Sequence, residues 1–229
     1  MQSLEVSTYT GPADSPASIN DGNDIKQSTD AVIKDLKARD IISKYDAVLV
    51  ACYSVHPLVD AITRDFASAR QSVTGIFEAS ILTALSILPS NTTSALRARQ
   101  WGIVTTGKYW EEHLASGVAS FLGGTDAKSN LKFAGVQSSG LDAGDFHSVD
   151  PAEVARKLKE AAVRLFQSGD VDCVAMGCAG MAGLEQIIRA AAVDTYGEER
   201  GNQVAIVDAV KAGILQLDLT VKSKRLFLT

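Results

Sequence analysis

Two of the three cysteines follow runs that predict strands buried in parallel sheets. Cys52 ends the apolar run 46–52 (DAVLVAC), and Cys178 comes shortly after the run 171–176 (VDCVAM). Continuous apolar, β-branched runs are typical of strands covered on both faces. Ligands of such sheets bind beyond the carboxyl ends of the strands, where amides of the next helix point outward. We therefore expect both thiols to face a bound molecule, and we expect Cys173, inside its run, to be a core residue.

Two thiols on opposite sides of one molecule are suited to racemisation. The reaction removes a proton from one face of a carbon next to a carbonyl and returns a proton to the other face, so it needs a base and an acid. A thiolate and a thiol fill these roles and exchange them with each turnover, and a helix N-terminus lowers a thiol pKa enough to supply the thiolate. Small or polar residues follow each cysteine, namely Tyr53 and Ser54, and Ala179 and Gly180. We expect these four residues to contact substrate through amides that stabilise an enolate oxygen.

Four further side chains are candidates for the same cleft. Glu78 lies at a strand–helix junction, where its carboxylate either caps the helix or contacts the cleft. Thr105 and Thr106 end a strand, so their hydroxyls either bind substrate or cap the next helix. His56 precedes Pro57 at a helix start, a position that favours a capping role over that of general base.

Strands and helices alternate along the chain. Alternating or continuous apolar runs predict strands at residues 4–9, 46–52, 72–76, 101–106, 131–136 and 171–176, and a strand or helix at 204–207. Apolar residues three or four apart predict helices at 28–42, 57–66, 78–88, 108–122, 151–169 and 209–217. A further helix is predicted to follow the glycine-rich turn around 177–180 and to end at about residue 193. This alternation indicates βαβ units, that is, an α/β fold whose parallel sheets are flanked by helices.

A cluster of helix-breaking residues near the middle of the chain indicates a boundary. The segment 89–93 (PSNTT) separates two parts of similar length, and each part holds one buried strand that ends at a cysteine. We therefore expect two similar lobes, each with a parallel sheet, and an active-site cleft between them.

Composition excludes several classes of protein. The 229 residues are 46% hydrophobic and 21% charged, which is enough apolar material for a core and excludes global disorder. The net charge of −5 argues against a nucleic-acid binder. The sequence contains no run of about 18 apolar residues, so it predicts no membrane-spanning helix. The first positive charge is Lys26, so the basic flank of a signal peptide is missing.

Cysteine usage predicts a reducing compartment. Three cysteines are an odd number in a long chain, which makes a disulfide framework unlikely, and no C-x-x-C occurs to indicate a redox pair or a zinc ribbon. We expect a cytoplasmic protein that acts on a small molecule without a metal, and its self-association into a homo-oligomer is left open.

Four motifs in this order resemble those of the Asp/Glu/hydantoin racemase superfamily. They are ACYSVHPL (51–58), GIFEAS (75–80), IVTTGKYWE (103–111) and GCAGM (177–181), and the C-terminal VDAVKAGI (207–214) extends the resemblance over nearly the whole chain. The sequence is most similar to the hydantoin racemase branch and its fungal members. The resemblance implies two α/β lobes, no cofactor, no metal and one catalytic cysteine from each lobe, which match Cys52 and Cys178.

The resemblance also implies the domain organisation. In the family the last helix returns to the first lobe. We therefore assign residues 1–97 and 203–229 to a first lobe that carries Cys52, and residues 98–202 to a second lobe that carries Cys178.

Two features depart from the family pattern. Members usually open with a strand and an Asn-Pro-Asn loop before the element that corresponds to residues 4–10, and this sequence begins after that point. Members with the ACYS-type motif generally carry Asp where this chain has Val55. The missing strand would lie centrally in the first sheet, and its loop contacts substrate in relatives.

The leading hypothesis is a cofactor-independent racemase of 5-substituted hydantoins or a related ureide such as allantoin. The absence of a basic residue next to the thiols in the sequence favours a neutral cyclic substrate over a free amino acid. One alternative is a reaction like that of maleate isomerase or arylmalonate decarboxylase, in which a cysteine adds to a double bond or protonates an enolate. The other is a non-catalytic or truncated member that binds a nitrogen metabolite, which the two departures support.

Overall fold

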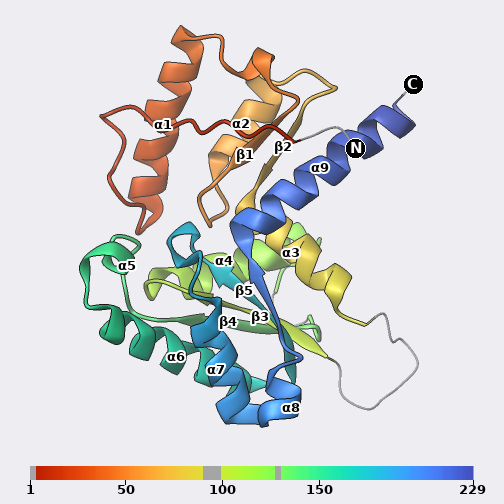
Figure 1. Cartoon of the computed structure of the whole chain (residues 1–229). Coiled ribbons are helices and arrows are strands. Elements are labelled where there is room, and N and C mark those ends of the chain that lie inside the picture. Colours follow the sequence, from red (N-terminus) through yellow and green to blue (C-terminus); the bar gives the residue numbers. More distant parts are fainter. Residues whose placement is uncertain (1–3, 90–98, 127–129, 229) are drawn as a thin grey trace.

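The computed structural model describes residues 4–89, 99–126 and 130–228 of the chain. Within these residues, parallel strands form one sheet of two strands and one of four, and helices cover both (Figure 1). The predicted α/β class with parallel sheets flanked by helices is confirmed. None of the described helices is long and apolar enough to cross a membrane.

The smaller sheet pairs β1 (Ala47–Val50) with β2 (Ser72–Gly75). Successive side chains of a strand point to opposite faces of the sheet, and the apolar run of β1 therefore serves two layers. Val48 and Val50 pack with α1 (Gly22–Ala38) and α2 (Pro57–Asp65), whereas Leu49 packs on the other side. There it contacts Gly213 of α9 (Ala209–Phe227).

The larger sheet has the strand order β4-β3-β5-β6. Its members are β3 (Gln100–Thr105), β4 (Phe133–Ser138), β5 (Val171–Gly177) and β6 (Ala205–Asp208). Side chains of β5 alternate between two cores. Cys173 and Ala175 pack with α3 (Ile76–Ile87) and α4 (Tyr109–Phe121), and Val174 and Met176 pack with α6 (Pro151–Ser168) and α7 (Glu185–Tyr196). Cys173 is fully buried.

Short helical segments complete the connections between these elements. They are η1 (Ile42–Lys44), α5 (Asp145–Ser148), η3 (Ala179–Met181) and α8 (Glu198–Gly201). Two helices start at the predicted residues, Pro151 and Pro57. In each, the preceding side chain caps the helix: Asp150 caps α6, and His56 caps α2. α1 starts at Gly22, earlier than predicted, because Asp21 accepts hydrogen bonds from two amides of its first turn.

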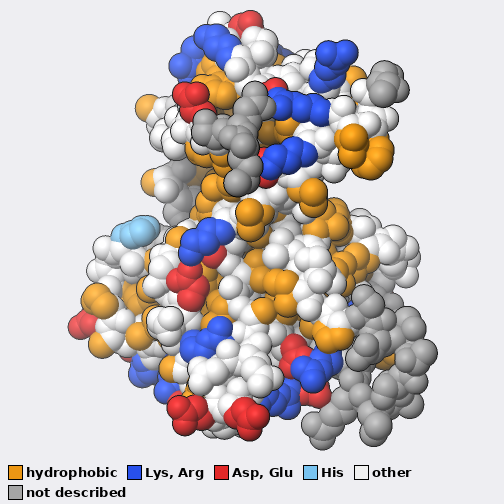
Figure 2. Space-filling model, turned by 45° about the vertical axis from the view of Figure 1, so that its right-hand side comes forward, with side chains coloured by type: hydrophobic (Ala, Val, Ile, Leu, Met, Phe, Trp, Pro, Cys, Tyr) orange, Lys and Arg blue, Asp and Glu red, His pale blue; other side chains and the backbone are white. Residues whose placement is uncertain are grey.

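Two helices join the sheets to each other. α3 follows β2 of the smaller sheet but packs against β5 and β6 of the larger one, and it also packs along α9. α9 starts at the end of β6 and runs past β1 and β2 (Figure 1). Exposed apolar side chains on these two helices include Leu82 of α3 and Leu215 and Leu219 of α9. Figure 2 shows apolar side chains gathered over the middle of the face it presents.

The prediction of a strand at residues 4–9 is wrong. This segment is not a strand in the structure, and Leu4 and Val6 are 58% and 64% exposed. Among the described residues it makes no backbone hydrogen bond to a strand, and β1 pairs only with β2. An alternating sequence needs a partner strand to become part of a sheet, and the described chain does not supply one here.

The division into a first lobe (1–97 and 203–229) and a second lobe (98–202) stays a prediction. The pairing of β6 bears on the boundary at residue 203. β6 pairs with β5 in the larger sheet, with Val174 opposite Ile206. The chain therefore reaches the smaller sheet only with α9, whose Gly213 lies against Leu49. β6 extends the larger sheet because its apolar side chains Ile206 and Val207 pack into the two cores of that sheet.

Candidate active site

Cys52 lies in the turn that follows β1. The strand ends at Val50, and the chain then turns so that the amide of Ser54 donates to the carbonyl of Cys52 at 3.0 Å. This turn brings the Ser54 hydroxyl to 3.4 Å from the Cys52 sulfur. Ser54 is 1% exposed, whereas Cys52 is half-buried. The thiol thus sits at the carboxyl end of its strand with one hydroxyl beside it.

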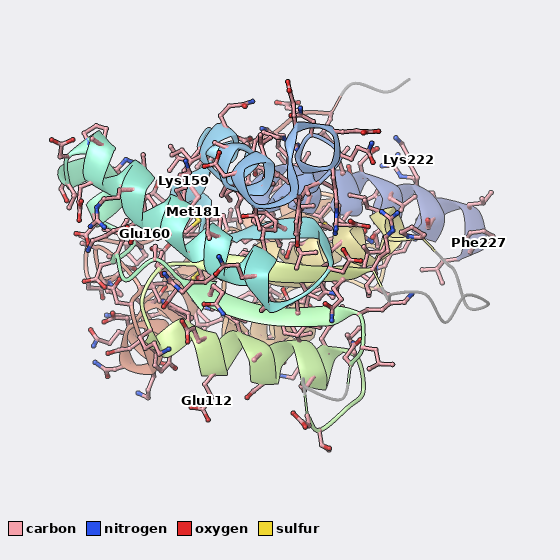
Figure 3. The ribbon with its side chains drawn as sticks, turned by 90° about the horizontal axis from the view of Figure 1, so that it is seen from below. Glu112, Lys159, Glu160, Met181, Lys222 and Phe227 are labelled. Atoms are coloured by element: carbon pink, nitrogen blue, oxygen red, sulfur yellow. The ribbon has the colours of Figure 1, made fainter. Side chains whose placement is uncertain are left out.

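Cys178 occupies the corresponding place after β5. Its sulfur accepts a hydrogen bond from the Gly180 amide at 3.4 Å, because the chain winds directly into η3. Met181 ends this segment and is fully buried in the core with α6 and α7. Figure 3 shows Met181 beside α6 in the interior. The buried methionine anchors the turn that presents the thiol.

Burial and nearby charge both act on the pKa values of these two thiols. Burial raises the pKa of Cys52 to about 11, and the negative charge of Cys178 contributes to that rise. Burial also raises the pKa of Cys178, but the amides of Gly180 and Met181 act in the opposite direction. The two thiols follow strands of two different sheets, and the charged form of Cys178 opposes ionisation of Cys52.

The threonines at the end of β3 support the Cys178 turn. The Thr105 hydroxyl donates to the carbonyl of Gly177 at 2.8 Å, so it links β3 to the residue before the cysteine. The carbonyl of Thr106 accepts from the amide of Gly140 at 3.0 Å. Both threonines are buried. The Thr105 hydroxyl therefore donates its proton to a protein carbonyl and not to a ligand.

Tyr53 points away from the site into the core. Its hydroxyl is 2.8 Å from that of Ser80, which donates to the carbonyl of Phe77. The Tyr53 ring packs edge-on against Phe77, with 5.6 Å between centroids. Its side chain therefore holds the Cys52 turn on α3, and only its backbone is left to face a ligand.

Glu78 lies at the start of α3 and folds back over Gly75. A Cβ atom on Gly75 would lie only 2.4 Å from a carboxylate oxygen of Glu78, so the glycine makes this position of the carboxylate accessible. That oxygen, Oε2, is buried and has no hydrogen-bond partner among the described side chains and backbone. Burial raises the pKa of Glu78, whereas amides of Gly75 and Glu78 lower it.

His56 and Val55 shape the other side of the Cys52 turn. His56 accepts the amide of Leu58 through Nδ1 at 3.3 Å, and burial lowers its pKa to about 4, so the ring is neutral at pH 7. Val55 packs against Gly117 of α4, where an added Cβ would lie 2.4 Å from the valine methyl group. The apolar residue at this position is thus fitted to a helix of the other sheet.

Sequence reasoning missed two features near the thiols. Asn20, in the turn-rich loop before α1, accepts the amide of Ala143 at 3.3 Å. Ala143 belongs to the loop against which Gly180 lies. No sequence signal singles out Asn20, because its role depends on a loop more than a hundred residues away. Gly117 was missed because a glycine within an amphipathic helix does not reveal which side chain it accommodates.

A surface groove runs along α4 beside Val55. It is lined by Val55, Lys108, Tyr109, Glu111, Glu112, His113, Ser116, Gly117 and Ser120. In Figure 3 Glu112 points outward from α4. Neither Cys52 nor Cys178 lines this groove. Among the described residues no three His, Cys, Asp or Glu side chains lie together in a way that could hold a metal ion.

Curated proteins of similar sequence come from fungi. The chain is 32% identical over 211 residues to the uncharacterized protein C1F7.10 of Schizosaccharomyces pombe, a match that covers 92% of this chain and 77% of that protein. It is 30% identical over 193 residues to protein DCG1 of Saccharomyces cerevisiae, covering 81% and 73% of the two chains.

Two solved structures share the fold. The allantoin racemase from Klebsiella pneumoniae superposes with a TM-score of 0.68 at 19% identity, over 93% of this chain and 74% of that one. The allantoin racemase from Pseudomonas fluorescens gives 0.67 at 20% identity, over 96% and 78%. The profile of the Asp/Glu/hydantoin racemase family matches residues 1–217. The chain therefore belongs to the Asp/Glu/hydantoin racemase family.

Proposed function

We propose that the protein is a cofactor-independent racemase of 5-substituted hydantoins or a related ureide such as allantoin, with Cys52 and Cys178 as its acid and base. The observation that supports it best is the placement of these thiols. Each follows the carboxyl end of a parallel strand, the strands belong to different sheets, and the charge of one raises the pKa of the other. Family membership and the fold of two allantoin racemases support the same class of reaction.

The proposed reaction is a proton exchange across one carbon atom. A thiolate takes the proton from the carbon next to the carbonyl, and the electron pair moves onto the carbonyl oxygen to form an enolate. The second thiol then delivers its proton to the opposite face, so the two sulfurs end the turnover with their protonation states exchanged. Backbone amides of the Cys52 and Cys178 turns are the proposed donors to the enolate oxygen. General acid–base catalysis of this kind contributes roughly 10²–10⁴-fold in rate.

The substrate-binding side of the proposal rests on backbone more than on side chains. Ser54, Ala179 and Gly180 lie in the two turns. The amides of Ser54 and Gly180 bond within these turns, so we propose the Ala179 amide as a donor to a neutral ring that has two carbonyl oxygens. Tyr53 and Thr105 direct their hydroxyls at protein groups, so we propose that they position the turns. We keep Glu78 as a proposed ligand-binding residue, because its buried Oε2 has no hydrogen-bond partner among the described residues.

The test follows the optical rotation of single-enantiomer allantoin and 5-benzylhydantoin in D₂O. We expect wild-type protein to abolish the rotation faster than buffer alone while one deuterium enters the asymmetric carbon. Cys52→Ser and Cys178→Ser are each expected to slow this at least about 100-fold. Cys173→Ala is the matched control, because that thiol is buried in the core, and it retains activity.

Three results would contradict the proposal in different ways. A folded wild-type protein that leaves both rotations unchanged favours a non-catalytic binder. Full activity of Cys52→Ser or Cys178→Ser excludes the two-thiol mechanism. A product with an altered skeleton or a fixed configuration, seen by NMR, favours an isomerase or decarboxylase reaction.

A further inference from the structure

We infer that the two thiols are unequal before substrate binds: Cys178 is the first to become the thiolate, and Cys52 keeps its proton, with Ser54 as the residue that positions the Cys52 sulfur. The sequence places both cysteines in similar strand-end turns, so it cannot distinguish them. The inference rests on the proposed function only for the use of the thiols in proton transfer.

Among the described residues, the hydrogen bond to the Cys178 sulfur comes from a group that can only donate. The Gly180 amide points at the sulfur from 3.4 Å, and a backbone N–H cannot reverse its role to accept a proton from a thiol. Such a donor stabilises the charged form of its partner and does little for the neutral form. The amides of Gly180 and Met181 lower the pKa of Cys178, and the buried Met181 keeps them in place.

The Cys52 sulfur has a partner of a different kind. The Ser54 hydroxyl, 3.4 Å away, is able to donate to a thiolate or to accept from a thiol. This hydroxyl can partner either protonation state and lowers the pKa of Cys52, but burial outweighs it and raises that pKa to about 11. Ser54 is held by its own amide, which donates to the carbonyl of Cys52 at 3.0 Å.

Charges in the neighbourhood reinforce the difference. The charge that acts on Cys52 is that of Cys178 itself, so ionisation of Cys178 makes ionisation of Cys52 harder. Around Cys178 the effects that oppose or favour ionisation are burial and backbone amides. His56, the nearest histidine to Cys52 in sequence, is neutral at pH 7 because burial lowers its pKa to about 4. The two sites thus titrate in sequence, Cys178 first.

This order has a consequence for kinetics. The enantiomers of a free substrate have equal free energies, so kcat/KM must be the same in both directions whatever the thiols do. A comparison of kcat/KM for the two enantiomers therefore does not reveal a difference in pKa between the thiols, and the titration of each thiol has to be measured directly. Once Cys178 has ionised, the enantiomer that presents its hydrogen to Cys178 meets a base at once.

The experiment measures alkylation of each cysteine by iodoacetamide in the ligand-free, full chain between pH 6 and 11. Peptide-resolved mass spectrometry at low conversion separates the three thiols, and circular dichroism verifies the fold at each pH. We expect the rate for Cys178 to rise at least one pH unit below that for Cys52, a tenfold difference in thiolate fraction at equal pH. Cys173 is the internal reference for a buried thiol, since burial raises its pKa to about 12.

Three variants separate charge from access. Cys178→Ala removes the charge and is expected to move the Cys52 profile to lower pH, whereas Cys52→Ala leaves the Cys178 profile unchanged because Cys52 is still protonated when Cys178 titrates. Ser54→Ala is expected to move the Cys52 profile to higher pH without affecting Cys178. Ser86→Ala is the matched control, since that hydroxyl lies on the exposed side of α3 and bonds to the carbonyl of Thr83 one turn earlier.

The outcomes distinguish this inference from the proposed function. Equal profiles, or a Cys52 profile at lower pH, overturn the inference even if racemisation is intact. An unequal order of the expected sign in a protein that does not racemise either substrate upholds the order and overturns only the proposed function. A Ser54→Ala variant with an unchanged Cys52 profile removes Ser54 from the account.

Discussion

At the scale of single residues, burial decides what the ionisable groups near Cys52 do. His56 is 3% exposed, and its Nδ1 accepts the amide of Leu58, which requires this nitrogen to be unprotonated. Protonation would remove this acceptor and bury a charge. The histidine is therefore a helix cap that works only in its neutral form, and its lowered pKa of about 4 follows from its location.

His56 makes the stability of the protein depend on pH. Its pKa is about 4 in the folded chain, whereas an unperturbed histidine has a pKa of 6.5. Between these values the unfolded chain binds more protons, so the free energy of unfolding falls as pH falls. The slope is at most about 1.4 kcal/mol per pH unit for one proton. Urea unfolding at pH 7.5 and pH 5.0 measures this effect. His56→Asn keeps a capping acceptor without the ionisation, and an unchanged pH dependence in this variant would contradict the prediction.

At the scale of elements, each cysteine depends on how one strand leads into the next segment. β1 leads into a turn closed by Ser54, and β5 leads directly into η3. α9 follows its strand just as directly, since β6 ends at Asp208 and the helix starts at the next residue. Asp208 accepts the amides of Val210 and Lys211 at 2.9 and 3.0 Å, so one side chain both ends the strand and caps the helix.

Loss of this cap is expected to destabilise the protein. Asp208 is 8% exposed, and its replacement in Asp208→Ala leaves two amides of α9 without their acceptor. We expect a loss of roughly 1–2 kcal/mol in the free energy of unfolding, measured by urea titration with tryptophan fluorescence. Asp208→Asn keeps the acceptor oxygen and is expected to stay within about 0.5 kcal/mol of wild type. Equal losses in both variants would assign the effect to the charge and its contact with Lys211 instead.

At the scale of the whole molecule, α3 and α9 hold the two sheets in the arrangement that brings the thiols together. α9 approaches β1 closely at Gly213, where an added Cβ would lie 2.6 Å from a Leu49 methyl group. α3 carries Phe77, against which Tyr53 of the Cys52 turn packs. The packing of these two helices thus fixes how the sheets, and the turns that carry the thiols, lie relative to each other.

Gly213→Ala tests this packing. Alanine gains up to about 1 kcal/mol over glycine in a helix, but the close approach to Leu49 is expected to cost roughly 1–3 kcal/mol. We expect a net loss of stability together with slower racemisation, since the smaller sheet is displaced. The double variant with Leu49→Ala is expected to show a coupling energy of at least about 0.5 kcal/mol, measured by a double-mutant cycle in urea. Additive single effects would mean that α9 accommodates the methyl group without moving.

Much of the fold was predictable because its signals are local. Continuous apolar runs indicated the buried strands of the larger sheet, and Asp150 and His56 marked helix starts through their own capping chemistry. The segment 4–9 was not predictable in the same way. Its alternation is that of a strand, yet a strand exists only where a partner offers hydrogen bonds, and within the described residues none does.

The presence of two thiols after two buried strands follows from the order of residues alone, because hydrophobic pattern and cysteine position are both properties of neighbouring residues. Only the tertiary structure decided that Tyr53 faces the core, that β6 joins the larger sheet and that Gly117 accommodates Val55. It also decided that Cys52 meets a hydroxyl and Cys178 an amide. The physical reason is that a pKa and a direction of packing depend on groups that meet only when distant segments fold together.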